Sequence, residues 1–398
     1  IILGVALLAV LLPALGRRGS GFYRGSLFGP VIFFLVAVLA AAIFGAVQGT
    51  GTGPFLMQAA WAEARSFIYL IICYVLAANL ITNRRRLQVL LWIIILTIGM
   101  KGIQGLSHFL VERRLGVQLE SITGHEDVVF FGTFFLLLAA MLLFGGDRRQ
   151  RIVMLCLLAP VVFTELATSR RIAFFILPFG FLIIGAGLFQ TNRRLFFKIV
   201  PVVAILLVAY TAIFWNRTDT LLGEPARAFQ SQVGTASVRD ERSDAWRALE
   251  RENITGNIRS APLTGLGFGR PYRFYVPEPS LVSSGFVYWT YITHNAVFWV
   301  WMKMGAVGFI AFFLLLGSAI VQGLANFRQL SDSTLRVLSI TIAGLVVMQI
   351  LFAYGDLGLT YARPMIFLGC MLGVLVRLPG LDQTVYHQPT DQTVLGGE

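Results

Sequence analysis

The stretch that decides the fold class is residues 31–47, which read VIFFLVAVLAAAIFGAV. This run carries no charged side chain and is about long enough to cross the hydrocarbon core of a bilayer. Similar apolar runs recur near residues 1–15, 61–81, 87–103, 128–144, 152–168, 172–189, 199–215, 296–320, 335–352 and 364–376. Because lipid offers the backbone no hydrogen-bond partners, such runs must be helices. We therefore predict an all-α, polytopic integral membrane bundle with about eleven spans.

The composition agrees with a chain whose main solvent is lipid. Hydrophobic residues make up 57% of the sequence and charged residues 13%, which excludes an ordinary soluble protein. The first residue is not Met and lies inside an apolar run, so we expect one more helix before it and about twelve spans in the full protein. Cys73, Cys156 and Cys370 fall within predicted spans and have no metal-binding spacing, which predicts buried apolar cysteines.

Basic residues cluster at alternate span boundaries, at Arg17–Arg18, Arg84–Arg86, Arg148–Arg151, Arg193–Lys198, Arg328–Arg336 and Arg377. Short loops rich in Lys and Arg stay in the cytoplasm, so all six clusters are predicted to lie inside. This orientation places residues 48–60, 104–127, 169–171, 216–293 and 353–363 on the outer side. The net charge of +12 then reflects contacts with anionic membrane lipids, and no nucleic-acid partner is predicted.

Four parts of the chain follow from these boundaries. Residues 1–215 and 294–378 are predicted to form the N-terminal and C-terminal transmembrane helices, and residues 216–293 one long periplasmic loop. Residues 379–398 are polar and are predicted to form a disordered cytoplasmic tail.

The long loop contains a predicted helix over residues 237–253. One stripe of this helix carries Arg242, Trp246, Leu249 and Asn253, while Glu241, Arg247, Glu250 and Arg251 lie largely on other faces. An arginine on a packed face needs an anionic partner, so Arg242 is a candidate anion ligand. The alternative is an ion pair with Asp244 or Glu278, or stacking of its guanidinium on Trp246.

Residues 262–269 of the same loop read PLTGLGFG. Gly265, Gly267 and Gly269 match neither the dinucleotide fingerprint nor the P-loop, so taken alone they indicate a tight turn. The aromatic residues between Tyr272 and Tyr291 are typical of a belt at the lipid interface, and the alternative is stacking against sugar rings.

His294 and Asn295 stand where the next apolar run begins. The positive end of the helix dipole disfavours an imidazolium there, which would keep the His294 ring neutral and basic. Asn295 would orient His294 or a ligand. The alternative is a capped histidine without a chemical role.

The turn Ser169-Arg170-Arg171 interrupts two apolar runs with almost no loop between them. Arginines at the edge of the bilayer either bind an anionic ligand or anchor the helix at the interface. Of the two, Arg170 is the one that we favour for function.

The ordered set of motifs resembles the O-antigen ligase and O-antigen polymerase superfamily of bacterial membrane glycosyltransferases. The matching elements are Thr168-Ser169-Arg170, Arg242-Ser-Asp-Ala-Trp246, residues 261–269, and His294-Asn295 with Gly305 and Gly308 downstream. The hydropathy pattern agrees over nearly the whole chain. The sequence departs from the family pattern at Arg171-Ile172, where small residues are usual, and at Met302-Lys303-Met304, where an acidic residue is often found.

The resemblance implies a fold similar to that of C-type glycosyltransferases, in the inner membrane of a bacterium and with a site that faces the periplasm. It also implies transfer of a glycan from an undecaprenyl diphosphate carrier to an acceptor hydroxyl without a metal. In ligases the acceptor is a sugar of the lipid A core, as in lipopolysaccharide biosynthesis. In polymerases it is another carrier-linked glycan, and related enzymes glycosylate proteins.

The residue chemistry supports this reaction independently. Arginine forks suit the oxygens of a leaving diphosphate, a role for Arg170 and Arg242, and His294 is placed to act as the general base. Arg171, Asn295, Trp246 and Gly267 are further candidate substrate-binding residues, and His108 and His125 are reserve histidines. No metal ligand and no cofactor are predicted.

Two other classes remain open. A glycolipid transporter or flippase would use the same arginines without needing a base, and would favour spans broken near the middle of the bilayer. A metal-dependent oligosaccharyltransferase would need clustered carboxylates. Asp240 and Asp244 form the single such pair in the outer loop, and their spacing is typical of solvated helix charges.

Overall fold

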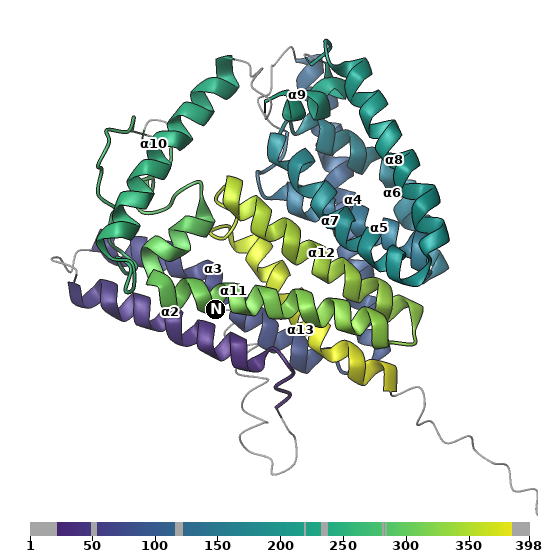
Figure 1. Ribbon diagram of the computed structural model, residues 1–398, viewed down its shortest axis with the longest axis horizontal. Coiled ribbons are helices and arrows are strands. Elements are labelled where there is room, and N and C mark those ends of the chain that lie inside the picture. The colour runs from purple at the N-terminus through teal and green to yellow at the C-terminus, as the bar shows by residue number, and fades with distance from the viewer. Residues whose placement is uncertain are drawn as a thin grey trace, which may run out of the picture.

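The computed structural model describes residues 22–48, 54–115, 122–218, 220–231, 238–280, 282 and 285–383 (Figure 1). The long helices of this part are α2 (Phe28–Gln48), α3 (Pro54–Leu80), α4 (Arg84–Arg114), α5 (Asp127–Phe144), α6 (Arg148–Ala167), α7 (Arg171–Thr191), α8 (Arg193–Phe214), α10 (Val238–Ser260), α11 (Ala296–Gln329), α12 (Ser333–Gly355) and α13 (Ala362–Gln383). All of them except α10, ten helices in the described residues, are long and apolar enough to cross a membrane. The prediction of an all-α, polytopic membrane bundle is confirmed.

Ten of the eleven predicted spans coincide with these helices, and the first, residues 1–15, lies outside the described residues. The helices exceed the apolar runs where polar side chains continue the last turns, as in α4, which ends at Arg114. The prediction of buried cysteines holds for Cys73 but is wrong for Cys156, which is exposed on α6.

The C-terminal boundary needs a correction. Helix α13 continues to Gln383, and Leu381 within its last turn is buried. The carboxylate of Asp382 accepts a hydrogen bond from the backbone N–H of Ser331 at 2.9 Å, which fixes the end of the helix to the α11–α12 turn. Residues 379–383 are therefore helical and not part of a disordered tail. Residues 384–398 lie outside the described part.

A GxxxG pattern on α13 packs this helix against α3. A Cβ atom at Gly369 would lie 2.2 Å from the carbonyl oxygen of Leu70, and one at Gly373 would lie 2.5 Å from that of Tyr74. Small residues at this spacing let two membrane helices approach closely, where contacts between backbones replace the hydrophobic driving force. The pair α3–α13 holds the bundle together on the side that faces α2 and α11.

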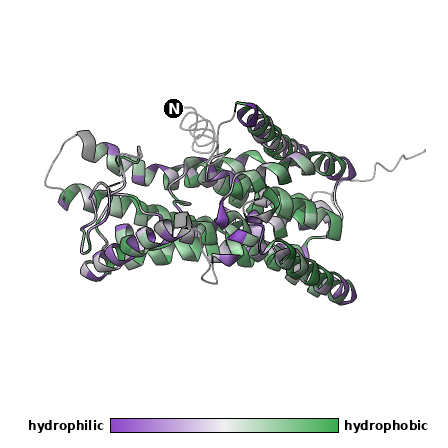
Figure 2. Cartoon of the chain, turned by 90° about the horizontal axis from the view of Figure 1, so that it is seen from above, coloured by the Kyte–Doolittle hydropathy of each residue, from purple (hydrophilic) through white to green (hydrophobic). Residues whose placement is uncertain are grey.

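Loops that were predicted to lie on one side of the membrane lie at one end of the bundle. At one end, Arg84 pairs with Asp332 at 2.5 Å and Arg377 donates to the carbonyl of Ala78. At the other end, which we call the site end, residues 122–127, 168–170, 294 and 356–361 come together through the contacts described below. Hydrophobic residues dominate the helices, and hydrophilic ones form smaller patches near the middle of the view and at the tips of several helices (Figure 2).

The polar segment after α8 contains a short 3-10 turn (Leu221–Gly223), α9 (Glu224–Gln230) and α10. Helix α9 packs on α7 and α10 packs on α11, so the two parts of the segment stand over different sides of the bundle (Figure 1). The predicted loop helix is confirmed as α10, but it runs to Ser260 and is longer than predicted.

Candidate active site

The turn formed by residues 262–269 is inserted between α2 and a break in α11. Gly305 interrupts α11 with φ of 66°, a left-handed conformation that favours glycine. The break leaves the carbonyls of Met302 and Lys303 open, and the backbone N–H groups of Leu266 and Gly267 donate to them at 2.8 and 2.9 Å. A Cβ atom at Gly267 would lie 2.4 Å from the backbone nitrogen of Gly45 on α2. Gly267, a predicted substrate-binding residue, is thus a packing residue in this structure.

A buried ion pair fixes the end of the same turn. The Nζ atom of Lys303 lies 2.6 Å from Oε1 of Glu63 on α3, and both side chains are fully buried. The other oxygen of Glu63 accepts from the backbone N–H of Gly269, and Lys303 also donates to the carbonyl of Arg270. Two buried charges remain only where they satisfy one another, so removing one partner alone would be costly. The departure from the family pattern at Lys303 is therefore balanced by Glu63.

Two asparagines of α10 hold the segment that returns toward α11. The side-chain oxygen of Asn253 accepts from the backbone N–H groups of Tyr275 and Val276, and its amide donates to the carbonyl of Val276 at 2.8 Å. Asn257 makes the same two kinds of contact with the backbone of Arg273, at 2.9 and 2.8 Å. Both asparagines are fully buried and replace the backbone partners that a strand would supply. This arrangement fixes α10 relative to the beginning of α11.

Glu278 and Tyr272 form a polar pair beneath this returning segment. The hydroxyl of Tyr272 donates to Glu278 at 3.0 Å, and Asn253 donates to the other oxygen at 2.6 Å. Burial raises the pKa of Glu278 above its ordinary value, although both hydrogen bonds act in the opposite direction. Burial also raises the pKa of Tyr272, which stays a neutral donor.

His294 is held by a buried carboxylate. Its backbone N–H donates to both oxygens of Glu250 at 3.1 Å, and its Nδ1 lies 3.3 Å from Oε1 of the same residue. Glu250 is 1% exposed, while the His294 side chain is 22% exposed. A carboxylate on Nδ1 selects the tautomer that carries its proton there, which leaves Nε2 as the nitrogen that can accept a proton. The pair has the geometry of an oriented general base.

Sequence reasoning placed Glu250 on another face of α10, and this was wrong. Glu250 points inward together with Asn253, four residues after Trp246 on the same side of the helix. The spacing of Trp246 and Glu250 is a helical i, i+4 signal in the sequence. This spacing did not predict a buried Glu250, because a glutamate on a helix is usually solvated.

Trp246 and Asn295 border His294. The rings of Trp246 and His294 meet edge to face with centroids 4.8 Å apart, so the indole restricts the orientation of the imidazole. Asn295 caps α11, and its side-chain oxygen accepts from the backbone N–H of Phe298 at 3.0 Å. The contact of Asn295 is with the helix and not with the His294 ring.

The two arginines of the α6–α7 turn are used differently. Arg171 forms a two-pronged ion pair with Asp244 of α10, at 3.0 and 2.9 Å, and ties α7 to the polar segment. Asp244, interpreted as a solvated helix charge, has a side chain that is 45% exposed and in addition makes this ion pair. Arg170 caps the beginning of α7 after Ser169, which has a left-handed φ of 52°. Arg170 is half-buried and lies near Tyr361: burial raises the pKa of that phenol above its ordinary value, and the charge of Arg170 acts in the opposite direction.

Arg242 lies in α10, but its side chain is outside the described residues, as is that of Asp240. The alternative partners considered for Arg242 have contacts of their own. Asp244 binds Arg171, and Glu278 binds Asn253 and Tyr272.

A second group of polar residues joins Arg170 to His294. Nδ1 of His125 lies 3.2 Å from Oδ2 of Asp356, the residue that follows α12. The pKa of Asp356 lies below its ordinary value, and a positive charge on His294 contributes to this lowering. Burial raises the pKa of Tyr361; the negative charge of Asp356 adds to this rise, and the positive charge of Arg170 opposes it. These residues come from four separate parts of the chain. The structure thus brings together Arg170, His294 and the reserve histidine His125, whereas His108 pairs with Glu112 on α4.

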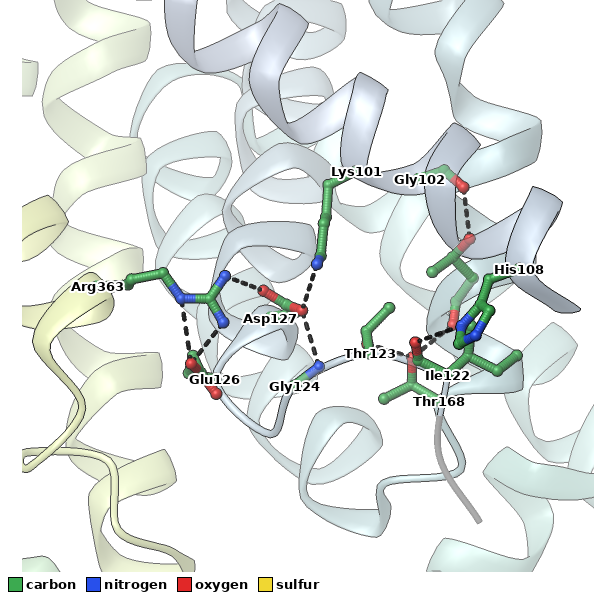
Figure 3. Close-up of polar contacts among 11 residues, drawn as sticks. Lys101, Gly102, His108, Ile122, Thr123, Gly124, Glu126, Asp127, Thr168 and Arg363 are labelled. Atoms are coloured by element: carbon green, nitrogen blue, oxygen red, sulfur yellow. Dashed lines mark hydrogen bonds and ion pairs between the residues drawn. The ribbon is translucent and has the colours of Figure 1, made fainter. Parts of the chain in front are cut away.

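Two carboxylates of the site end, Glu126 and Asp127, are paired with cations. Asp127 contacts Lys101 and Arg363, and Glu126 also contacts Arg363 (Figure 3). Within the described residues, no group of three or more His, Cys, Asp or Glu side chains is arranged to hold a metal ion.

In the described residues, ten helices are long and apolar enough to cross a membrane, and arginines and histidine–carboxylate pairs gather at one end of them. These features define a polytopic membrane protein with a polar candidate site at that end. Residues 155–313, which include Arg170, Arg242, Glu250 and His294, match the family model described as O-antigen ligase. This match places the segment in the O-antigen ligase superfamily of membrane glycosyltransferases and confirms the resemblance seen in the motifs. No curated protein matches the chain.

Proposed function

We propose that this protein transfers a glycan from undecaprenyl diphosphate to an acceptor hydroxyl, and that the acceptor is a sugar of the lipid A core. The observation that carries the proposal is the pair formed by His294 and the buried Glu250. Binding or moving a glycolipid needs no oriented base, whereas transfer to a hydroxyl does. A transporter is therefore the weaker alternative.

The geometry supports an inverting displacement. Glu250 holds His294 so that Nε2 removes the proton of the acceptor hydroxyl as its oxygen attacks the anomeric carbon. The bond between that carbon and the phosphate oxygen breaks, and the electron pair moves to the diphosphate. Arg170 and Arg242 stabilise the charge that develops there. The reaction needs no metal and no cofactor.

The test is transfer by the purified protein in detergent or lipid, with an undecaprenyl diphosphate-linked glycan as the donor. The acceptor is either a lipid A core or a second carrier-linked glycan. We expect transfer to the core, also in the presence of a chelator. Transfer to the second carrier-linked glycan alone would assign a polymerase instead, and binding of the donor without any transfer would favour a transporter.

Replacing Glu250 by Gln should lower the transfer rate with little change in the amount of folded protein. The amide has one acceptor oxygen where the carboxylate has two, and in either orientation its NH₂ group faces an N–H of His294, so the preference of the ring for the Nδ1–H tautomer weakens. In the serine-protease triad the corresponding change costs about 10⁴-fold, and here we expect at least about 10-fold. The rate is measured as turnover of the purified variant.

The matched control is Glu252→Gln, because Glu252 is exposed on the same helix. It should turn over like the wild type. An unchanged rate in the Glu250→Gln variant would mean that the carboxylate only caps the backbone.

The proposed orientation puts the site end in the periplasm. In an otherwise cysteine-free variant, Ala248→Cys on α10 should react with a membrane-impermeant thiol reagent in cells whose outer membrane is permeabilised, because Ala248 is exposed. Arg149→Cys, exposed at the opposite end of the bundle, should react only after the inner membrane is opened. The reverse pattern would place the site in the cytoplasm and exclude the proposed reaction.

A further inference from the structure

The site end contains a second histidine–carboxylate pair that the mechanism above does not use. His125 and Asp356 lie 231 positions apart in the sequence and 3.2 Å apart in space. Asp356 is buried at 4% exposure, whereas 40% of the His125 side chain is exposed. The buried carboxylate engages Nδ1, so Nε2 of a partly exposed ring is the nitrogen that a ligand can reach.

His125 lies on the Arg170 side of the site. The hydroxyls of Thr123 and Thr168 are 2.8 Å apart and join the segment that carries His125 to the turn that carries Arg170 (Figure 3). Tyr361 lies near both the His125–Asp356 pair and Arg170: it hydrogen-bonds Asp356, and its pKa, which burial raises, is also influenced by the charges of Asp356 and Arg170. His294 lies on the α10 side and is held there by Glu250. The two histidines therefore belong to different sides of one polar region.

The segment that carries His125 is rigidly held. The backbone N–H of Gly124 donates to Asp127 at 2.9 Å, and Asp127 also lies 3.5 Å from Nζ of Lys101 (Figure 3). Arg363 contacts both Glu126 and Asp127, at 2.5 and 3.3 Å. A frame of ion pairs thus fixes the residues on both sides of His125, which is the support that a catalytic side chain needs.

The group that faces Nδ1 of His125 is a charged carboxylate. Burial alone would raise the pKa of Asp356, but the hydrogen bond and charge of His125, the charge of His294 and the N–H of Leu357 outweigh it. The pKa of Asp356 therefore lies below its ordinary value, and this residue is a carboxylate at neutral pH. Asp356 also follows the carboxyl end of α12, whose dipole favours a cation.

The amino end of α5 begins two residues after His125, and its dipole disfavours a cation at that position. The carboxylates of Glu126 and Asp127 lie at the same helix end and are themselves paired with Arg363 and Lys101. Among the described residues, the charged or titratable groups near Asp356 and Tyr361 also include Arg170 and His294. His294 likewise stands two residues before a helix, α11, and its carboxylate Glu250 also accepts from a backbone N–H, but in the described part of the chain the Glu250 pair has no helix carboxyl end beside it like that of α12 beside Asp356.

We propose that His125, oriented by Asp356, is a second catalytic residue that acts on the leaving diphosphate. This inference rests on the proposed function. Protonated His125 donates a hydrogen bond from Nε2 to a diphosphate oxygen. As the bond between the anomeric carbon and the phosphate oxygen breaks, the electron pair passes to the diphosphate and the proton of Nε2 follows. His294 takes the proton of the acceptor hydroxyl, so one proton is gained and one is released in each transfer.

The test compares His125→Gln with the wild type on two synthetic donors that differ only in the group that bridges the two phosphorus atoms. A methylene bridge makes the diphosphate analogue a poorer leaving group, and a difluoromethylene bridge makes it a better one. A general acid matters most for the poorer leaving group. We expect a loss of about 10²- to 10³-fold on the methylene donor and of no more than about 10-fold on the difluoromethylene donor.

Asp356→Asn should show the same dependence on the leaving group with a smaller loss. His108→Gln is the matched control, because His108 contacts the same segment through the carbonyl of Ile122 but pairs with Glu112. A loss of equal size on both donors would mean that His125 has a structural role, and a wild-type rate would mean that it has none. Either result overturns the inference while wild-type transfer of the natural donor still supports the proposed function.

Discussion

The His294→Gln variant should bind the carrier-linked donor like the wild type and transfer its glycan about 10²- to 10⁴-fold more slowly. Gln fills a similar space and can keep the hydrogen bond to Glu250, but it has no nitrogen that accepts a proton. The backbone contacts of residue 294 with Glu250 do not depend on the side chain, so α10 and α11 should stay in register. Turnover and donor affinity are measured on the same purified preparation.

The wild-type rate should also fall on acidification, because an imidazolium has no lone pair for the acceptor proton, and the variant should lose most of this dependence. The control for the ring contact is Phe286→Leu, since Phe286 also borders the His294 ring, with centroids 6.2 Å apart. If His294→Gln turned over like the wild type, His294 would be a packing residue, and its assignment as the general base would be wrong.

The fold was predictable because it depends on runs of apolar residues. Each of the ten described spans is a property of some 20 consecutive residues, and lipid leaves such a run no alternative to a helix. The alternation of basic clusters likewise predicted which loops meet, and the contact of Arg84 with Asp332 joins two of them.

The site was predictable only where a residue type is rare in its setting. His294 and Arg170 are unusual at the mouth of a span, and both lie at the site end. Glu250 was missed because one more glutamate on a polar helix carries no signal, and its burial is decided by α11, a separate element. The pairing of His125 with Asp356 depends on how α5 and α12 pack, which no local pattern encodes.

The positions of Gly267 and Lys303 were also not predictable from local sequence. Gly267 was a reasonable ligand candidate in a glycine-rich turn, yet its close contact with Gly45 arises from the packing of the turn on α2. Lys303 would be excluded from a buried position by its charge, and only the approach of Glu63 from α3 makes that position stable.

Replacing Arg170 by Ala should reduce transfer about 30- to 1000-fold while the protein still folds and inserts, and Arg242→Ala should do the same. Loss of one charge-assisted contact at a developing charge corresponds to about 2–4 kcal/mol. The capping contact of Arg170 is made by its backbone carbonyl, which accepts from the N–H of Ala173 at 3.0 Å, and alanine keeps this contact. Arg170→Lys should restore part of the rate, because lysine keeps the charge but not the planar fork.

The neighbouring arginine, Arg171, is the matched comparison. Its guanidinium donates to both oxygens of Asp244, so Arg171→Ala should weaken the attachment of α10 to α7 and lower the thermal stability of the protein. Arg170→Ala should instead weaken the binding of diphosphate, measured with undecaprenyl diphosphate alone. If Arg170→Ala kept both its turnover and its affinity for diphosphate, the anion site would move to Arg242 and His125, and Arg170 would be an anchor at the membrane edge.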